Sequence, residues 1–284
     1  MTAARLLYET ETWGVGVRFT PEIPIEMASV KDLLLRASDI VSRLYQSGTA
    51  VFKKVDGSPL TQADTEVNEF LKETLLEKIP HAGWLSEETA DNPDRLANDW
   101  VWVVDPLDGT IEFTRGIPEF AISVGLVFRQ QAVMGGVINP ATGEGGLGVV
   151  GGQLEFWGGK NQRTPASDLS DACATISRTE AEDGSVLPFI RCVGSAHPVG
   201  SVAYKLLRVA AGIDHLTISA QHKSEWDICG GVALLYAAGK VYRRFDGQSL
   251  RFNQRNTRIL SGAVAGNEDI VSEFLTALDS KASY

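Results

Sequence analysis

Apolar residues recur three or four positions apart in two segments near the start of the chain. Residues 30–46 carry this pattern, with Ser29 as the candidate N-cap, and it predicts an amphipathic helix. A second helix is predicted over residues 62–79, with Thr61 as its cap and Pro80 at its end. The apolar positions of the first helix are Val30, Leu33, Leu34, Ala37, Ile40, Val41 and Leu44.

Short apolar runs predict strands through the rest of the first half. Residues 101–104 are β-branched and aromatic, which is typical of a buried strand. Residues 120–128 and 131–138 predict a hairpin, and the glycine-rich residues 143–159 predict further short antiparallel strands. Residues 81–100 are mostly polar and predict a loop.

Strand and helix segments alternate after a polar stretch at residues 160–172. The antiparallel hairpins before this stretch and the alternation after it predict an α+β half joined to an α/β half. We expect an irregular arm over residues 1–28, the first half over 29–160 and the second half over 161–284. In the second half, the predicted strands are 174–177, 190–193, 215–219, 240–245 and 258–265, and the predicted helices are 201–211, 227–238 and 267–278.

The charge balance narrows the choice of partners. The 284 residues carry a formal net charge of −10, which argues against binding a nucleic acid polymer or an anionic membrane through a basic face. No apolar run is long enough to span a membrane, and the first residues lack the apolar core of a signal peptide. Cys173, Cys192 and Cys229 show no CxxC spacing, so we expect reduced thiols in a cytoplasmic protein. The sequence leaves open whether the protein forms a homodimer.

The predicted buried strand runs directly into an acidic turn. Pro106 favours an extended Asp105, so the turn can direct the carboxylates of Asp105 and Asp108 to one point. Gly109 permits a close backbone approach, and Gly109 and Thr110 can open a helix whose first N–H groups face an anion. Two hard oxygen ligands at such a helix start favour Mg²⁺ and a phosphate, whereas this motif alone also fits a capped turn with solvated aspartates. The turn reads Asp105-Pro106-Leu107-Asp108-Gly109-Thr110.

Three further stretches accompany the acidic turn. They are Asp56-Gly57-Ser58-Pro59-Leu60-Thr61-Gln62-Ala63-Asp64, Trp84-Leu85-Ser86-Glu87-Glu88-Thr89 and Glu225-Trp226-Asp227. With the turn, and in this order along residues 30–275, they resemble the inositol monophosphatase superfamily of Mg²⁺-dependent, lithium-sensitive phosphatases. That superfamily includes inositol monophosphatases, 3′(2′),5′-bisphosphate nucleotidases of the CysQ type and fructose-1,6-bisphosphatases. The resemblance implies a layered αβαβα sandwich that hydrolyses a small phosphorylated substrate.

The resemblance also implies a set of metal ligands. Glu87, Asp105 and the Leu107 carbonyl correspond to the ligands of a first Mg²⁺. Asp105, Asp108 and Asp227 correspond to those of a second, and Glu87 also faces a loosely held third ion. Oxygen donors of this kind suit Mg²⁺, and two or three ions are expected. By itself, Asp227 would be an ordinary helix N-cap.

The catalytic residues implied by the resemblance are Asp64, Thr110 and Glu87. Asp64 would accept a hydrogen bond from the Thr110 hydroxyl, which in turn orients the attacking water. The alternative for Asp64 is a first-turn carboxylate that favours the dipole of its own helix, and both roles can hold together.

Two backbone segments are implied to face the substrate. The N–H groups of Gly109 and Thr110 would bind the phosphate. Gly200 and Ser201, at the start of the predicted helix 201–211, align with the residues that contact the leaving group in the family.

Details of the motifs favour a CysQ-type nucleotidase. Leu107 within the turn and Glu112-Phe113 after it are similar to nucleotidases, whereas inositol monophosphatases usually show isoleucine and then Asn-Phe. The glutamate that contacts inositol hydroxyls is missing from residues 217–220, and so is the arginine often found there in nucleotidases. Lys223 is a candidate replacement for that arginine. The alternatives are an inositol-1-monophosphatase, a fructose-1,6-bisphosphatase or a non-catalytic member that binds metal or phosphate.

Other motif-like features are expected to be structural. A GxGxxG match at Gly143, Gly145 and Gly148 is followed by no helix pattern, so a glycine-rich hairpin is expected there. The four histidines show no zinc-type spacing and are expected to be solvated or core residues. They are His81, His197, His215 and His222.

Overall fold

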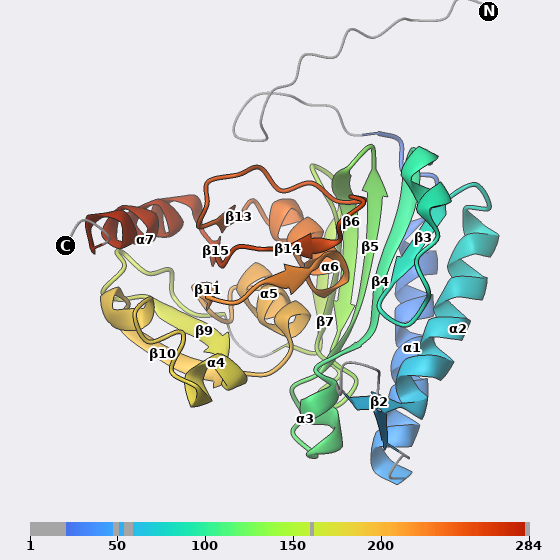
Figure 1. The fold of residues 1–284 in the computed structure, drawn as a ribbon, viewed down its shortest axis with the longest axis horizontal. Helices are drawn as coiled ribbons and strands as arrows, with labels where there is room; N and C mark the ends of the chain where they lie inside the picture. The colour runs from blue at the N-terminus through green and yellow to red at the C-terminus, as the bar shows by residue number, and fades with distance from the viewer. Residues whose placement is uncertain (1–20, 48–50, 54–58, 160–161, 282–284) are drawn as a thin grey trace, which may run out of the picture.

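The chain folds into five alternating layers of helices and sheets (Figure 1). The computed structural model describes residues 21–47, 51–53, 59–159 and 162–281. One helix pair covers the outer face of a six-stranded sheet, a second pair lies between this sheet and a five-stranded sheet, and a last helix covers the far side. The predicted αβαβα sandwich is therefore confirmed. Its main helices are α1 (Met27–Ser47) and α2 (Gln62–Lys78), then α5 (Val202–Ala210) and α6 (Glu225–Ala237), and finally α7 (Glu268–Lys281).

The six-stranded sheet has the order β3-β4-β5-β6-β7-β8. β3 is parallel to β4, and every later pair is antiparallel. The hairpin predicted over residues 120–138 and the short strands predicted after it are confirmed. The strands are β3 (Gly83–Ser86), β4 (Trp100–Asp108), β5 (Ala121–Phe128), β6 (Gln131–Ile138), β7 (Gly145–Val149) and β8 (Leu154–Trp157).

The prediction of a loop over residues 81–100 is wrong at β3. This strand has four residues, too few for a periodic signal, and pairing with β4 makes it a strand, with Trp84 opposite Trp102. Its Leu85 and Ser86 are buried. A short 3₁₀ helix, Pro93–Ala97, occupies part of the remaining segment.

The five-stranded sheet has the order β10-β9-β11-β15-β13. β9 is parallel to both of its neighbours, and β15 is antiparallel to β11 and β13. The strands are β9 (Cys173–Ser177), β10 (Ser195–Val199), β11 (Leu216–Ser219), β13 (Val241–Arg244) and β15 (Ala263–Gly266). Two small antiparallel ladders lie outside the large sheets, β1 (Val51–Lys53) with β2 (Pro59–Thr61) and β12 (Lys223–Ser224) with β14 (Arg258–Ile259).

Two predicted strands of the second half are corrected. Residues 190–193 include a 3₁₀ helix, Ile190–Cys192, and the strand of this region is β10. The apolar residues of segment 190–193 are partly buried and pack against the core between the five-stranded sheet and α7. β10 is an edge strand that includes polar residues, so its sequence shows no apolar run. The predicted strand at residues 258–265 is divided into β14 and β15.

Apart from α2, which begins at Gln62 as predicted, the main helices begin one to three residues from their predicted starts. α1 begins at Met27, so Ser29 lies in its first turn and not at its N-cap, and the helix begins within the predicted arm. Residues 1–20 of that arm lie outside the described residues. α6 begins at Glu225 with Ser224 as its N-cap, so Asp227 is the third helical residue. The cap of α2 at Thr61 is confirmed.

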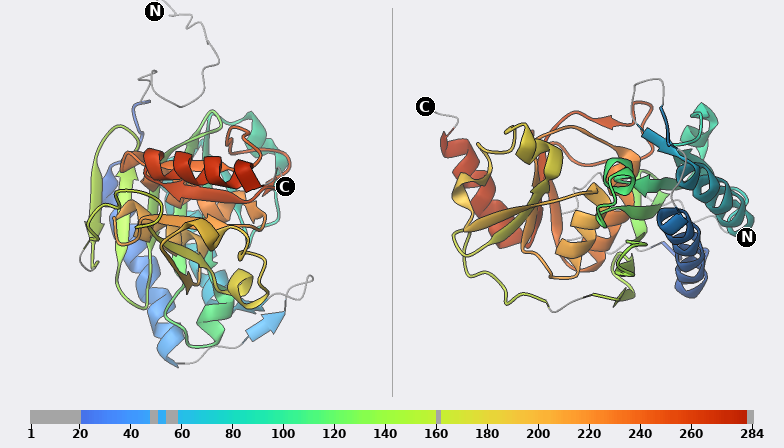
Figure 2. Two further views of the ribbon diagram at one scale, coloured as in Figure 1. Left: turned by 90° about the vertical axis from the view of Figure 1, so that its left-hand side faces the viewer. Right: turned by 90° about the horizontal axis from the view of Figure 1, so that it is seen from below.

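Glycines let α6 lie close to the six-stranded sheet. A Cβ on Gly230 would lie 2.7 Å from Ser123 Oγ and 2.9 Å from Val124 O, and one on Gly135 would lie 2.0 Å from Gly230 O. Only glycine permits this approach of backbones. The view from below in Figure 2 shows the same layers end on, with α1 and α2 on the outside. α6 thereby carries Asp227 from the second predicted half to the acidic turn of the first.

Candidate active site

The acidic turn forms where β4 loses register with β5. Asp105 lies opposite Ser123, and the register then shifts before Asp108 pairs with Ala121. Such a bulge redirects side chains at the end of a strand. Leu107 N–H donates to Asp105 Oδ1 at 3.0 Å, so the turn itself orients the first carboxylate.

Gly109 links β4 to the short helix α3 (Thr110–Thr114). Its φ of +95° is a left-handed conformation, and a Cβ at this position would lie 3.0 Å from Glu119 O. A residue with a side chain would be strained here, so the glycine of the motif is a geometric requirement. The predicted helix start at Gly109 and Thr110 is confirmed, and its role in phosphate binding stays a prediction.

The turn opens into a pocket of about 310 Å³ between the two predicted halves of the chain. All five predicted metal ligands and all four predicted substrate-side residues line it, although they come from distant segments. The lining residues are Pro59, Glu87, Asp105, Leu107, Asp108, Gly109, Thr110, Ile111, Glu112, Ser177, Thr179, Gly200, Ser201, Val202, Lys205, His222, Lys223 and Asp227. The structure thus brings together the residues chosen from sequence.

The carboxylates of the pocket repel one another. Burial raises the pKa of Asp105 well above its ordinary range, and neighbouring carboxylates, led by Glu87, raise it further. Burial, and then the charge of Asp108, raises the pKa of Asp227 to about 7. Burial also raises the pKa of Asp108, against the opposing effect of its hydrogen bonds. A divalent cation would relieve this repulsion.

Each of the three aspartates is held through one oxygen. Asp105 accepts from Leu107 N–H through Oδ1, and Asp227 accepts from Ser224 N–H through Oδ2 at 2.8 Å. Asp108 Oδ2 accepts from Ser201 Oγ and from Ala203 N–H, both at 2.6 Å. The second oxygen of each carboxylate accepts none of these bonds and could hold a cation, and hard carboxylate oxygens are the donors that Mg²⁺ prefers.

Asp64 makes the contacts that both of its predicted roles require, and its catalytic role stays a prediction. Asp64 Oδ2 accepts from the N–H of Thr61 at 2.7 Å and from its hydroxyl at 2.6 Å, which closes a capping box at the start of α2. Asp64 Oδ1 lies 3.3 Å from Thr110 Oγ1. Thr110 Oγ1 also lies 3.1 Å from Leu107 O, so its single proton has two possible acceptors.

Gly200 and Ser201 line the pocket, but their polar groups already have protein partners. Ser201 caps α5 with a φ of +57° and donates its hydroxyl to Asp108. Gly200 N–H donates to Glu119 Oε2 at 2.8 Å. Ser201 therefore supports the carboxylate of Asp108, whereas Gly200 is held by Glu119, and direct contact of either residue with substrate stays a prediction.

Lys205 is a pocket residue that the sequence reasoning missed. It is buried, and its Nζ donates to Val199 O and Ser201 O at 3.1 Å each. Burial lowers its pKa to about 8, and Asp108 opposes that shift. Its signal in the sequence is a charged residue, one of two with Arg208, in a mostly apolar helical stretch four positions after Ser201. Lys205 brings a positive charge to the base of the acidic pocket.

Comparison with known proteins places this geometry in a family. The profile of the inositol monophosphatase family matches residues 26–279, which include every pocket residue. The chain belongs to the inositol monophosphatase family. It is a phosphatase, as are its relatives in that family.

The chain is similar in sequence to relatives of two kinds, bisphosphate nucleotidases and inositol monophosphatases. A 3′(2′),5′-bisphosphate nucleotidase CysQ of Aggregatibacter actinomycetemcomitans is 28% identical over 247 residues, covering 84% of this chain and 92% of the relative. An inositol-1-monophosphatase of Mesorhizobium japonicum is 31% identical over 240 residues, covering 79% and 84%. The extragenic suppressor protein suhB of Bartonella henselae has the same fold, with a TM-score of 0.75 at 26% identity over 89% of this chain and 97% of that chain.

We expect Mg²⁺ to stabilise the protein most strongly at high pH. Raised carboxylate pKa values mean that the native state binds more protons than the unfolded chain, so without metal the free energy of unfolding falls as pH rises. For Asp227 this fall runs from pH 3.8 to about 7. Ions bound only by the native state should restore stability, by about 2.7 kcal/mol at 100 times Kd.

The measurement is a thermal melt with EDTA and with Mg²⁺ at pH 5 and pH 8. The gain in Tm should be several degrees larger at pH 8. Burial also raises the pKa of Glu225 to about 7, and its carboxylate is bonded to the backbone of Asn253 and Gln254, outside the pocket. Part of the decrease in the free energy of unfolding with rising pH should therefore persist when Mg²⁺ is bound. Identical melts with and without Mg²⁺ at pH 8 would contradict a shared metal cluster.

Proposed function

We propose that this phosphatase is a Mg²⁺-dependent 3′(2′),5′-bisphosphate nucleotidase. The observation that carries the proposal is a pair of basic residues, His222 and Lys223, which line the pocket together with the acidic turn. A substrate with two phosphates needs cationic partners for the phosphate that is not being hydrolysed. Lys223 is the residue we expect to meet that phosphate.

The carboxylates of the pocket are proposed to hold the metal ions. Glu87, Asp105 and the Leu107 carbonyl would bind one Mg²⁺. Asp105, Asp108 and Asp227 would bind a second, and Glu87 would face a third. When bound, such ions activate a water and stabilise negative charge on the phosphate and the leaving oxygen.

Thr110 and Asp64 are proposed to position the attacking water. A Leu107 carbonyl engaged with a cation is a poorer acceptor, so the Thr110 hydroxyl would donate to Asp64 instead. The Thr110 oxygen could then accept a hydrogen bond from the water. Asp64, anchored by Thr61, would receive the proton through this link.

The segment at residues 217–221, the end of β11 and the residues after it, favours a nucleotide over an inositol phosphate. A carboxylate beside it, Glu180, is buried and accepts from Ser219 Oγ at 2.7 Å, Ala220 N–H at 2.8 Å and Gln221 N–H at 3.2 Å. Lys223 Nζ lies 3.4 Å from the same carboxylate. Glu180, in the short helix Arg178–Glu182, is thus engaged by residues 219–221 and is a poor partner for inositol hydroxyls. A site without such a partner loses about 1–3 kcal/mol per unmade bond.

The test is phosphate release from adenosine 3′,5′-bisphosphate, inositol 1-phosphate and fructose 1,6-bisphosphate. We expect kcat/KM to be at least tenfold higher for the nucleotide than for either sugar phosphate. A tenfold preference for inositol 1-phosphate would overturn the nucleotidase proposal and support the alternative of an inositol-1-monophosphatase. The phosphatase class would be unaffected.

A Lys223→Met variant tests the second-phosphate contact separately. We expect kcat/KM for adenosine 3′,5′-bisphosphate to fall about tenfold or more, because a charge-assisted hydrogen bond contributes about 1.5–3 kcal/mol. Hydrolysis of adenosine 3′-monophosphate, which lacks the second phosphate, should change little. Lys78→Met, at an exposed site at the end of α2, is the matched control. An equal loss with both nucleotides would remove Lys223 from this role.

A further inference from the structure

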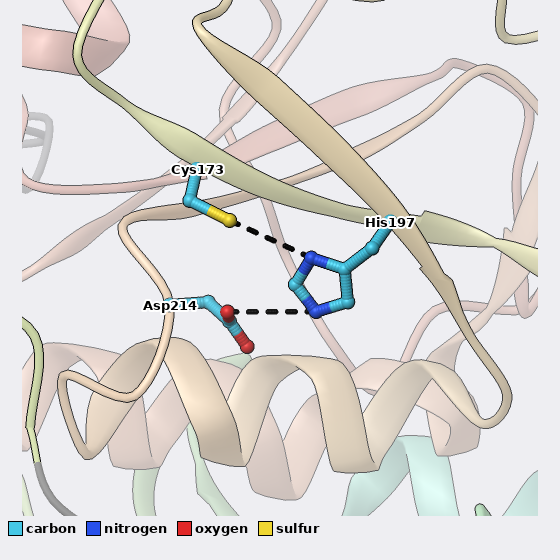
Figure 3. A group of neighbouring side chains, drawn as sticks. All are labelled: Cys173, His197 and Asp214. Atoms are coloured by element: carbon cyan, nitrogen blue, oxygen red, sulfur yellow. Dashed lines mark hydrogen bonds and ion pairs between the residues drawn. The ribbon is translucent and has the colours of Figure 1, made fainter.

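A second cluster of polar side chains lies at the opposite end of the five-stranded sheet (Figure 3). It comprises Cys173 at the start of β9, His197 in β10 and Asp214 just before β11. Cys173 Sγ lies 3.5 Å from His197 Nδ1, and Asp214 Oδ1 lies 3.6 Å from His197 Nε2. One ligand atom from each residue lies within 4.8 Å of the other two.

The cluster is separate from the catalytic pocket. β9 runs from Cys173 to Ser177, and Ser177 lines the pocket whereas Cys173 does not. Four residue steps along a strand span about 13 Å. The two sites therefore occupy opposite ends of the same strand.

Asp214 supplies the strongest indication that something binds here. Its side chain is fully buried, and its Oδ2 accepts from Arg208 Nε at 2.7 Å. Its Oδ1 is buried and has no hydrogen-bond partner in the structure. An unsatisfied buried carboxylate oxygen is costly, and a missing ion or water is a common explanation for one.

We propose that Cys173, His197 and Asp214 bind a thiophilic divalent cation such as Zn²⁺. Thiolate sulfur, imidazole nitrogen and carboxylate oxygen form a typical zinc donor set, with metal–ligand distances that put neighbouring donors about 3.5 Å apart. The sulfur–nitrogen separation of 3.5 Å matches this spacing on the Nδ1 side of the imidazole, and the oxygen–nitrogen separation of 3.6 Å matches it on the Nε2 side. His197 is partly exposed, so water can complete a tetrahedral site from the solvent side.

Binding needs a small adjustment of the imidazole. The thiol and the carboxylate face different ring nitrogens, and a single cation takes only one of them. Burial lowers the pKa of His197, which keeps the imidazole neutral and a lone pair available. The thiol of Cys173 would lose its proton to solvent as the sulfur–metal bond forms.

The groups around the cluster hold two of the ligands in place. Arg208 fixes Asp214 through Oδ2 and leaves Oδ1 facing the histidine. The N–H of Cys173 donates to His215 Nδ1 at 2.9 Å, which anchors the start of β9. Arg163 approaches Asp214 Oδ1 at 3.6 Å and donates from Nε to Ile213 O at 2.9 Å, so this 45% exposed side chain would have to turn toward solvent as a cation arrives.

Cobalt is the probe that tests this proposal. The full-length protein, reduced and stripped with EDTA, is titrated with Co²⁺ in excess Mg²⁺, which occupies the catalytic carboxylates. We expect a thiolate-to-cobalt charge-transfer band in the near ultraviolet that saturates at one ion per chain. Zn²⁺ should displace the cobalt, because zinc binds such ligands more tightly.

Two variants assign the band to this cluster. Cys173→Ser and His197→Ala should each abolish the band or weaken Co²⁺ affinity by at least about tenfold, since even indirect contacts to a metal contribute that much. Cys192→Ser, a partly buried cysteine in the neighbouring 3₁₀ helix, is the matched control and should keep the band. Absence of a thiolate band in the unmodified protein would overturn the proposal without any variant. A band that survives in Cys173→Ser would overturn it as well.

Discussion

Replacing Asp108 with asparagine is expected to lower kcat about a thousandfold or more while leaving the fold in place. The loss corresponds to roughly 4 kcal/mol of transition-state stabilisation, the scale expected when a metal ligand loses its charge. The fold should persist because an asparagine oxygen can still accept from Ser201 Oγ and Ala203 N–H, as Asp108 Oδ2 does now. The measurement is kcat across a Mg²⁺ range wide enough to reach saturation, together with a thermal melt.

Saturation with Mg²⁺ separates two explanations of a slow Asp108→Asn variant. A variant that only binds Mg²⁺ more weakly would recover its kcat at high Mg²⁺, whereas loss of a catalytic ion position would persist. Asp99→Asn is the matched control, because that carboxylate is 58% exposed and pairs with Arg129 away from the pocket. Near-normal kcat for Asp108→Asn at saturating Mg²⁺ would remove Asp108 from the catalytic centre.

The predictable parts of the fold and site are those determined by residues close together in the sequence. The capping box needs only Thr61 and Asp64, three positions apart, and it is present in the structure. Likewise, Gly109 turns the end of β4 into α3 because of its own backbone freedom. Both features depend only on residues within a few positions of one another, so the sequence is sufficient to predict them.

The parts that were not predictable depend on partners far along the chain. β3 is a strand because β4 is available beside it, and four residues show no period of their own. Lys205 was missed because its burial against Val199 and Ser201 follows from the packing of α5. The hydroxyl of Ser201 turns toward Asp108, a residue 93 positions away, and no spacing rule connects the two.

The cysteine cluster shows the same limit in a candidate site. His197 shows no zinc-type spacing in the sequence, because Cys173 lies at the start of β9 and Asp214 lies just before β11. Parallel pairing of β10 with β9 places His197 opposite Thr175, two residues after Cys173. Sheet register therefore carries information about this cluster that the linear sequence does not.

The second large effect is expected from Thr110→Val, which should lower kcat roughly a hundredfold or more with little change in Tm. Valine keeps the shape of the side chain but removes the hydroxyl that links Asp64 to the pocket. Asp64 would still accept from Thr61 through Oδ2, so the cap of α2 should survive. The measurement is kcat with the preferred substrate, paired with a thermal melt.

Thr61→Ala is the reciprocal variant and separates the two roles of Asp64. It removes the hydroxyl that accepts from Ala63 N–H and donates to Asp64, so it should cost about 1 kcal/mol of stability. The Thr61 N–H still donates to Asp64 Oδ2, so Asp64 should keep its position and kcat should change only a few-fold. Opposite outcomes are therefore expected, with activity lost in Thr110→Val and stability lost in Thr61→Ala. If Thr61→Ala lost as much kcat as Thr110→Val, or if Thr110→Val retained full activity, Asp64 would be a helix cap and not part of the catalytic centre.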